Sequence, residues 1–132
     1  MQTIPDEFRD LLERPIVVSL ATVMPQGAPQ VNPVWADLVD GKVRINTVTG
    51  RQKHRNLIDR RDVSVLVIDP ENVMRWMEIR GELASTSEDD GIEVINKLSQ
   101  DYTGVWPFPG LNDTDTRVTC LIAPKRVVTN VE

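Results

Sequence analysis

The stretch TGRQKHRNLIDRRDVSVLVIDPEN, which runs from Thr49 to Asn72, places a short basic helix directly before an apolar strand. Thr49 and Gln52 have the Thr-x-x-Gln spacing of a helix capping box, so we expect the helix to begin at Gly50. The run Val63–Ile68 is almost continuously apolar and is followed by the turn signal DPEN, which indicates a buried strand. A helix this short between strands points to a chain in which β-structure dominates.

The charges of this stretch run against those of the whole chain. The protein has 15 Lys and Arg against 20 Asp and Glu, yet Thr49–Arg61 holds five of these cations, one Asp and the only His. A helix dipole disfavours cations in the first turn. An anion bound there would reverse this, because free N–H groups at a helix start and basic side chains together bind phosphate. From charge and capping alone, an anion site and a merely solvated basic face are equally good interpretations.

Short apolar runs separated by turn signals extend in both directions from this stretch. The expected strands are Ile16–Val23, Gln30–Leu38, Lys42–Thr47, Val63–Ile68, Met74–Leu83, Val118–Ala123 and Val127–Val131. Pro33 indicates an edge, a bulge or a break in the second strand, and Pro124 separates the last two. Short connections favour antiparallel pairing, and six or seven such strands with about three helices favour a closed or partly closed barrel.

Two further helices and one irregular segment complete the pattern. Phe8, Leu11 and Leu12 have helical spacing after a possible cap at Thr3, which predicts a short first helix. Ser87 is expected to cap a third helix. The residues that would share one face of this helix are Ile92, Ile95, Leu98 and Tyr102. The segment 103–116, which contains WPFPG, has no regular pattern.

Length and composition exclude several classes of protein. With 132 residues, 40% of them hydrophobic and 27% charged, we expect one soluble domain spanning residues 1–132. No apolar run approaches the roughly 20 residues that cross a bilayer, and the acidic, amphipathic start is unlike a targeting peptide. We therefore expect a cytoplasmic protein with no membrane association. A pI near 4.9 argues against a general nucleic-acid partner. Cys120, within VTCLIA, is expected to be buried on a strand.

The chain lacks the side chains of most catalytic sites. One His and one Cys fall short of the three or four ligands that zinc uses, so no metal site is expected. His54 is the only His that could act as a base, and the cations around it disfavour its protonation, so we assign no catalytic residue. Neither a P-loop nor a Gly-rich dinucleotide loop is present. If the protein is an enzyme, a bound cofactor supplies its chemistry, and a phosphate-bearing redox cofactor fits the anion site.

Several segments, in this order and spacing, resemble one protein family. They are LATV, PQVNPVW, R-x-K-x-R-N-L at Arg51–Leu57, VSVLVIDPEN at Val63–Asn72 and R-x-x-E-x-R-G at Arg75–Gly81. The set is similar to the flavin and deazaflavin oxidoreductases related to pyridoxamine 5′-phosphate oxidase, and especially to the small branch that uses coenzyme F420, a deazaflavin. The resemblance covers about Ile16 to Thr129. It implies a mainly β fold with flanking helices, the six-stranded antiparallel split β-barrel known as the FMN-binding split barrel. It also implies a homodimer with a cofactor cleft at each end of the dimer interface.

The resemblance further implies a set of site residues. Those expected to hold the cofactor phosphate are Arg51, Lys53, Arg55 and Asn56. Those expected to line the cofactor ring are Asn32, Pro33, Asn46, Thr47 and Thr49. Trp76 and Trp106, the latter in the WPF loop, are candidates for the substrate side, although packing against the dimer partner would explain these aromatic residues equally well.

The resemblance implies an F420-dependent oxidoreductase that transfers hydride between the deazaflavin and a small, electron-poor organic substrate. An FMN-binding reductase on the same fold, a non-catalytic F420 or flavin carrier, and a structural domain remain alternatives. A compact phosphate pocket suits FMN, whereas a longer basic channel, for which Arg60 and Arg61 are candidates, suits the acidic tail of F420. The C-terminal substrate-binding segment of pyridoxamine 5′-phosphate oxidases is missing, which argues against vitamin B6 oxidation. His54 lies in the phosphate segment, which argues against haem degradation.

Overall fold

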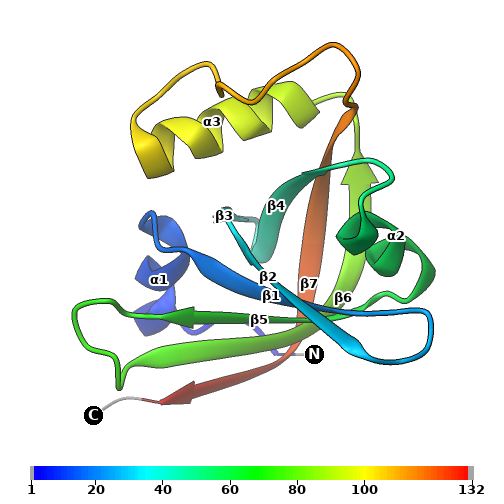
Figure 1. The fold of residues 1–132 in the computed structure, drawn as a ribbon. Coiled ribbons are helices and arrows are strands. Elements are labelled where there is room, and N and C mark those ends of the chain that lie inside the picture. Colours follow the sequence, from blue (N-terminus) through cyan, green and yellow to red (C-terminus); the bar gives the residue numbers. More distant parts are fainter. Residues whose placement is uncertain (1, 131–132) are drawn as a thin grey trace.

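Seven strands form one curled antiparallel sheet in the order β2-β1-β5-β6-β7-β4-β3 (Figure 1). The computed structural model describes residues 2–130. The strands are β1 (Val18–Val23), β2 (Pro29–Val34), β3 (Ala36–Val39), β4 (Lys42–Val48), β5 (Asp62–Ile68), β6 (Trp76–Ser87) and β7 (Arg117–Asn130). The helices are the 3₁₀ turn η1 (Asp6–Phe8), α1 (Asp10–Glu13), α2 (Gln52–Asp59) and α3 (Gly91–Thr103). The expected mainly β, antiparallel architecture is confirmed.

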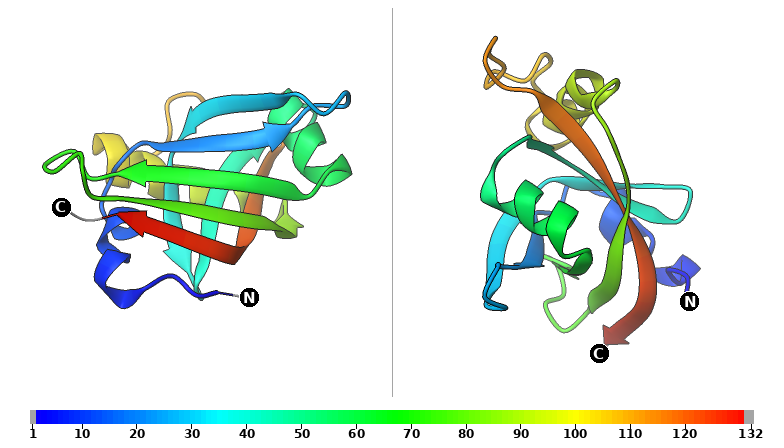
Figure 2. Two further views of the ribbon diagram at one scale, coloured as in Figure 1. Left: turned by 90° about the horizontal axis from the view of Figure 1, so that it is seen from below. Right: turned by 90° about the vertical axis from the view of Figure 1, so that its right-hand side faces the viewer.

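The segment predicted as one strand, Gln30–Leu38, is divided at Trp35 into two strands on opposite edges of the sheet. β2 pairs with β1, whereas β3 pairs with β4 at the other edge. This division adds one strand to the seven listed from the sequence, and the joining of the last two removes one, so the sheet has seven strands where the family resemblance implied six. Pro33 lies on the edge strand β2 opposite Ser19, as its missing N–H predicted. In Figure 2 the β3–β4 hairpin crosses the layer made by β2, β1, β5 and β6, so the chain passes from one layer to the other at Trp35.

The last strand, β7, is continuous, and the prediction of two strands separated by Pro124 is wrong. Pro124 lies opposite Gly81, where the register between β6 and β7 shifts. A Cβ at Gly81 would stand 2.2 Å from the Ala123 carbonyl oxygen, so the close approach of the two strands requires glycine. These irregularities allow the strands to bend. The first part of β7 can therefore pair with β4, while its pairing with β6 continues to Asn130. Val131 lies outside the described residues.

The basic helix α2 begins at Gln52, and the predicted capping box does not form. Gly50 has a φ of +87°, a left-handed conformation that separates Thr49 from the helix. The backbone N–H of Thr49 donates instead to the Thr116 carbonyl at 2.9 Å. The Gln52 amide donates to Asn56 Oδ1, one turn further on, at 2.8 Å. The sequence spacing of a capping box was present, but the turn at Gly50 placed its two residues out of reach.

Helix α3 begins at Gly91, four residues later than the cap predicted at Ser87. Ser87 is the last residue of β6 and pairs with Thr119, because β6 continues past its expected end. The apolar face is also shifted. Ile95 is buried as predicted, but Ile92 is 59% exposed. The helix lies over one end of the curled sheet (Figure 1), where it adds the last wall of a cavity described below.

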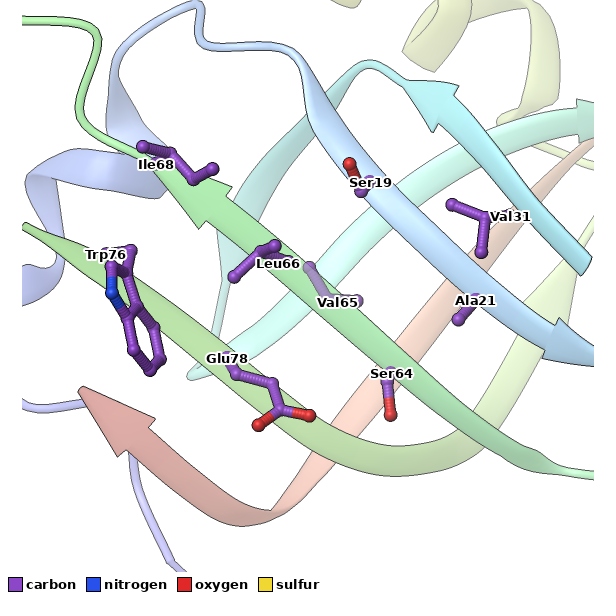
Figure 3. Close-up of a pocket in the computed structure, with 9 residues that line it drawn as sticks. All are labelled: Ser19, Ala21, Val31, Ser64, Val65, Leu66, Ile68, Trp76 and Glu78. Carbon is purple, nitrogen blue, oxygen red and sulfur yellow. The ribbon is translucent and has the colours of Figure 1, made fainter. Parts of the chain in front are cut away.

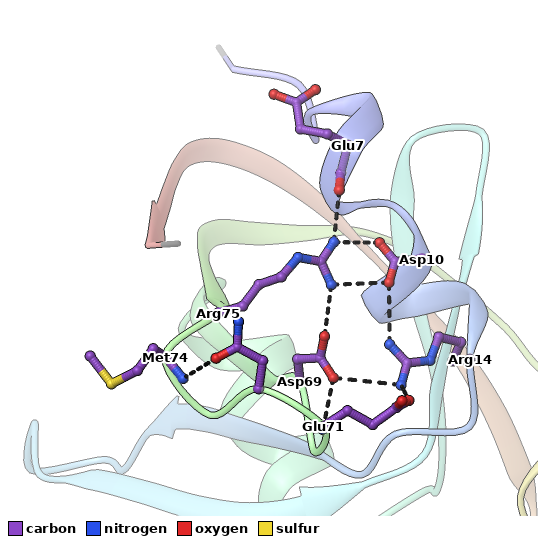
Figure 4. A network of polar contacts seen from close by, with 8 residues as sticks. Glu7, Asp10, Arg14, Asp69, Glu71, Met74 and Arg75 are labelled. Carbon is purple, nitrogen blue, oxygen red and sulfur yellow. Dashed lines mark hydrogen bonds and ion pairs between the residues drawn. The ribbon is translucent and has the colours of Figure 1, made fainter. Parts of the chain in front are cut away.

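The N-terminal helix packs as predicted, with Phe8, Leu11 and Leu12 buried in the main core. Arg75 fixes this helix to the turn between β5 and β6 (Figure 4). Its guanidinium donates to Asp10 at 2.6 Å and to Asp69 at 3.0 Å, and it lies 5.0 Å from the centre of the Phe8 ring. The hydrogen bond from Arg75 is the main reason that the pKa of Asp10 is lowered. These contacts attach the N-terminal helix to the turn between β5 and β6.

The lone cysteine is part of the core. Cys120 lies on β7 opposite Ile45 and is fully buried, as its apolar surroundings predicted. Burial raises the pKa of its thiol to about 11, so the thiol stays protonated at neutral pH. Residues 2–130 include no helix with the length and apolar character needed to cross a membrane.

Candidate anion-binding site

A cavity of about 420 Å³ lies between the start of α2, strand β4, helix α3 and the break between β2 and β3. Its lining consists of a basic side and an apolar, largely aromatic side. The lining residues are Val17, Pro33, Val34, Trp35, Asn46, Arg51, Lys53, Ile95, Leu98, Phe108 and Arg117. A space of this size, with apolar walls and a few polar groups, is typical of small-molecule and cofactor sites.

Three cations line the cavity with little compensating negative charge. Arg51 lies 3.9 Å from the carboxylate of Asp115, at the limit of an ion pair. The Lys53 ammonium has no hydrogen bond or ion pair to any residue in the described range 2–130. Burial, and then the charges of Arg51 and Arg117, hold the pKa of Lys53 below its ordinary value. Because the cations repel one another, an anion placed among them would stabilise all three.

Arg117, the first residue of β7, is the most buried of the three cations, with only 8% of its surface exposed. It donates to Asn46 Oδ1 at 3.4 Å, and its guanidinium lies 5.0 Å from the centre of the Phe108 ring. Its Nε is buried and has no hydrogen-bond partner among the described residues. Burial, and then the charge of Arg51, lower the pKa of Arg117. The only sequence signal for this residue was a single basic side chain at the start of an apolar strand.

The aromatic side of the cavity is held in place by Tyr102. Trp35 stacks on Tyr102, with 5.4 Å between ring centres, and meets Phe108 edge-on at 5.9 Å. The Tyr102 hydroxyl donates to the Ile16 carbonyl at 2.7 Å and accepts from the Ala36 N–H at 3.1 Å. These bonds attach α3 to the point where the chain passes from β2 to β3. The wall formed by Trp35 and Phe108 is therefore fixed from both sides.

Of the four residues predicted to hold phosphate, the structure brings two to the cavity. Arg51 and Lys53 line it. The Arg55 guanidinium turns back to the Gly50 carbonyl and to Gln52. Asn56 is fully buried, and its amide donates to Thr22 Oγ1 at 3.0 Å. Asn56 thus fixes α2 to β1, and a role for it or Arg55 in ligand binding stays a prediction.

Of the five residues predicted to line a cofactor ring, two line the cavity. Pro33 and Asn46 line the cavity, and the Asn46 amide donates to the Gly91 carbonyl at 2.8 Å. Asn32 neighbours Pro33 on β2, so its side chain points to the opposite face of the strand. Thr47 is buried, with 1% of its surface exposed, and is not among the residues that line the cavity. Thr49 is not among the lining residues either, and its backbone N–H donates to the carbonyl of Thr116, the residue before Arg117.

The other basic residues of the Thr49–Arg61 stretch turn away from the cavity. Arg60 donates to the Val23 carbonyl at 2.7 Å, and Arg61 donates to the Leu83 carbonyl at 2.9 Å. His54 accepts a hydrogen bond from the Gly50 N–H at 3.2 Å through Nδ1. The positive surface of the cavity therefore extends across to Arg117 and not along the helix.

Neither tryptophan predicted for the substrate side lines this cavity. Trp106 is 52% exposed, and Phe108 from the same loop takes the place at the wall. Trp76 lies in a separate apolar hollow of about 490 Å³ on the outer face of β1, β2, β5 and β6 (Figure 3). The exposed side chains of Val31 and Ile68 belong to the same hollow. We call this hollow the outer apolar face.

The outer apolar face and the cavity adjoin one another. On β2, two successive residues point outward. The first, Val31, lines the outer apolar face, and the second, Pro33, lines the cavity. The same relation holds between Ser19 on β1 and Val17, which precedes that strand. A molecule that covers the outer apolar face would therefore lie next to the cavity.

Comparisons with known proteins agree with this geometry. A sequence model of the pyridoxamine 5′-phosphate oxidase family matches residues 4–129. A solved structure of a protein described as an F420 reductase is 35% identical, with a TM-score of 0.86 over 95% of this chain and 98% of its own. Among curated protein sequences, none is significantly similar to this chain.

Two more distant structures share the fold. A conserved hypothetical protein from Mycobacterium tuberculosis is 22% identical, with a TM-score of 0.76 over 97% of this chain and 86% of its own. A putative pyridoxamine 5′-phosphate oxidase from Listeria innocua is also 22% identical, with a TM-score of 0.69 over 94% of this chain and 95% of its own. The curled antiparallel sheet is thus common to proteins whose sequences differ widely.

Proposed function

The chain belongs to the pyridoxamine 5′-phosphate oxidase family, and we propose that it is an F420-dependent oxidoreductase acting on a small, electron-poor organic substrate. The observation that carries the proposal is the cavity in which Arg51, Lys53 and Arg117 face an aromatic wall. Such a cavity suits a flat ring that carries anionic groups. The 35% identity to an F420 reductase supports the deazaflavin over other redox cofactors.

The residues present fit a phosphate-bearing cofactor. The buried, unpartnered Nε of Arg117 needs a hydrogen-bond acceptor, and the charges around Lys53 need an anion. Charge-assisted hydrogen bonds from Arg and Lys to phosphate are about twice as strong as hydrogen bonds between neutral groups. When bound in its reduced form, the deazaflavin would supply a hydride from C5, which no side chain of the chain can supply.

The chain's own residues have three tasks in this proposal. Arg51 and Lys53 bind phosphate and thereby fix the position of the ring along the cavity. The wall of Trp35 and Phe108 would exclude water from a bound ring, and Pro33 also borders the space that the ring would occupy. Lys53 is assigned to the phosphate, and no other side chain lining the cavity is a carboxylic acid, imidazole, thiol or phenol, so a proton for the reduced product comes from solvent in this proposal.

An FMN-binding reductase is the second candidate, and one observation favours it. Arg60 and Arg61 donate to backbone carbonyls away from the cavity, so the cationic surface is compact. A compact surface suits the single phosphate of FMN, whereas the acidic tail of F420 would benefit from a longer basic channel. The two cofactors therefore need to be compared directly.

We further propose that the protein acts as a homodimer in which a second copy covers the outer apolar face. Val31 and Ile68 expose 63% and 42% of their surfaces there, beside Trp76. Exposed apolar clusters of this kind mark interaction sites. Analytical ultracentrifugation of wild type and Val31→Glu tests this, and a monomeric wild-type protein would contradict it. Because this face adjoins the cavity, the dimer would also narrow the cavity mouth.

The cofactor is tested by titrating the purified protein with F420 and with FMN while following the fluorescence of each ligand. We expect saturable quenching of F420 and reduction of activated alkenes or quinones when reduced F420 is added. Binding of FMN alone would favour the second candidate. Tight F420 binding without turnover of any acceptor would indicate a carrier, and binding of neither cofactor would refute the proposal.

A further inference from the structure

Arg117 is a buried cation whose charge is not neutralised by an ion pair with any described residue. Its exposed fraction is 8%, and within residues 2–130 it forms no ion pair with a carboxylate. Its Nε has no partner there either. Charged groups in protein interiors are normally paired, because an isolated charge is costly to remove from water. A charge held in this state at a cavity wall points to a ligand that completes it.

Neighbouring residues fix the orientation of the Arg117 guanidinium. Asn46 bridges two segments, since its amide donates to the Gly91 carbonyl at 2.8 Å and its oxygen accepts from Arg117 at 3.4 Å. Phe108 supports the guanidinium from one side at 5.0 Å. A Cβ on Gly91 would stand 2.2 Å from the Arg117 carbonyl oxygen, so the start of α3 is fitted to this residue. Asn46 is therefore a positioning residue, with both ends of its amide already engaged.

The charge of the cavity suggests how much negative charge it accepts. Arg51, Lys53 and Arg117 contribute three positive charges, and Asp115 contributes one negative charge 3.9 Å from Arg51. Asp115 is held in place by Asn112, which donates to it at 2.8 Å. The difference, three minus one, leaves two positive charges to be matched. A ligand with a single negative charge would leave one cation uncompensated.

We propose that Arg117 binds the ligand's anionic groups together with Arg51 and Lys53, and that the site selects ligands carrying two negative charges. This inference rests on the proposed function. It adds to the site a residue that lies outside the basic helix α2. Two cofactors supply the required charge. FMN has a doubly charged phosphate monoester, whereas F420 has a phosphodiester followed by carboxylates.

A purely structural role for Arg117 makes different predictions. If the residue mainly holds Phe108 in place, its replacement would destabilise the protein and weaken every ligand alike. If it binds anions, replacing it with a methionine of similar length removes an uncompensated buried charge, which does not destabilise the ligand-free protein. Only anionic ligands would then lose affinity.

The test uses Arg117→Met, Arg117→Lys and the matched control Arg126→Gln, which removes a positive charge from an exposed position on the same strand. Four probes are titrated by fluorescence: F420, the same deazaflavin without phosphate and tail, FMN, and riboflavin. For the cofactor that wild type binds, we expect Arg117→Met to weaken binding by about tenfold to a hundredfold, as for loss of a charge-assisted hydrogen bond. Arg117→Lys should lose less, and Arg126→Gln should match wild type.

The comparison of probes separates the possible failures. We expect the phosphate-free probes to bind weakly and equally to wild type and Arg117→Met, and the melting temperature of the ligand-free variant to equal or exceed that of wild type. If wild type binds none of the probes, the proposed function itself fails. If wild type binds a cofactor and Arg117→Met binds it equally well, only the role of Arg117 is refuted. A lower melting temperature with equal losses for all probes would also refute it, in favour of a structural role.

Discussion

Replacement of Tyr102 by phenylalanine removes one oxygen atom from the joint between α3 and the break at Trp35. The hydroxyl donates to the Ile16 carbonyl at 2.7 Å and accepts from the Ala36 N–H at 3.1 Å. Phenylalanine keeps the ring that stacks on Trp35 at 5.4 Å. The variant therefore isolates the two hydrogen bonds from the packing of the aromatic wall.

The size of the effect follows from what the missing oxygen leaves behind. A net hydrogen bond contributes about 0.5–1.5 kcal/mol, and a partner left unpaired in a buried position costs about 1–3 kcal/mol. Because Tyr102 is only partly buried, we expect a loss of about 2–3 kcal/mol in the free energy of unfolding. For a chain of this length, about 3–4 °C of melting temperature corresponds to each kcal/mol, so Tyr102→Phe should melt about 6–12 °C lower.

The pH dependence of the same comparison provides a second measurement. Burial, the largest cause, raises the pKa of Tyr102 above its ordinary value of 10.0 in the folded protein. Between the unfolded and folded pKa values the folded protein binds more protons, so the stability that the neutral hydroxyl contributes falls as the pH rises. Tyr102→Phe lacks this contribution. The difference in stability between the two proteins should be constant below pH 10 and should shrink above it.

Thermal melts followed by circular dichroism measure the effect, with Gln100→Ala as the control. Gln100 is exposed on the same helix, and its replacement should change stability by less than about 0.5 kcal/mol. A melting temperature of Tyr102→Phe within about 1 °C of wild type would refute the reasoning, because it would mean that the hydroxyl contributes no net stability. A similar fall in the melting temperature of Gln100→Ala would instead indicate that any substitution in α3 destabilises the protein.

Three further changes test the cavity and its supports. Lys53→Met should weaken cofactor binding about tenfold to a hundredfold by fluorescence titration. Because the pKa of Lys53 is lowered from 10.5, the ligand-free wild type should also gain stability as pH rises through the range just below that value, and urea titrations of the variant should lack this gain. Gly91→Ala should lose about 1–3 kcal/mol in urea unfolding, since its Cβ would stand 2.2 Å from the Arg117 carbonyl oxygen, and an unchanged midpoint would contradict that contact. Arg75→Ala should lower the melting temperature at neutral pH. The difference from wild type should shrink as the pH falls from 3.8 through the lowered pKa of Asp10. A difference that persists at low pH would show that packing, and not charge, attaches the N-terminal helix to the turn between β5 and β6.

Sequence patterns predicted the features that depend on local chemistry. Alternating and β-branched runs located most strands, and Pro33 indicated the sheet edge because a missing N–H is tolerated there. The VTCLIA context indicated that Cys120 is buried. Arg51 and Lys53, predicted from a local charge anomaly and a family resemblance, do line one cavity.

Features that depend on contacts between distant segments were missed. The division at Trp35 is decided by pairing of β2 with β1 and of β3 with β4, which no local pattern encodes. Pro124 is tolerated inside β7 because the register shifts opposite Gly81 on another strand. Arg117 lies 64 positions after Lys53, the nearest residue of the basic helix that lines the cavity, so sequence proximity indicated no link between the two.

The division of the chain at Trp35 also has a kinetic consequence. Three strand pairs, β1–β2, β3–β4 and β5–β6, join segments that are close in the chain. In contrast, the residues paired between β4 and β7 are far apart in the sequence, from Val48 with Arg117 to Val43 with Ile122. Long-range pairings carry the larger loop-closure entropy and form slowly. We therefore expect hairpins to form early and β7 to dock last. Arg117 would reach Asn46 only in that final step, so a ligand that needs all three cations can recognise only a chain that has finished folding, and its presence would lengthen the lifetime of that state.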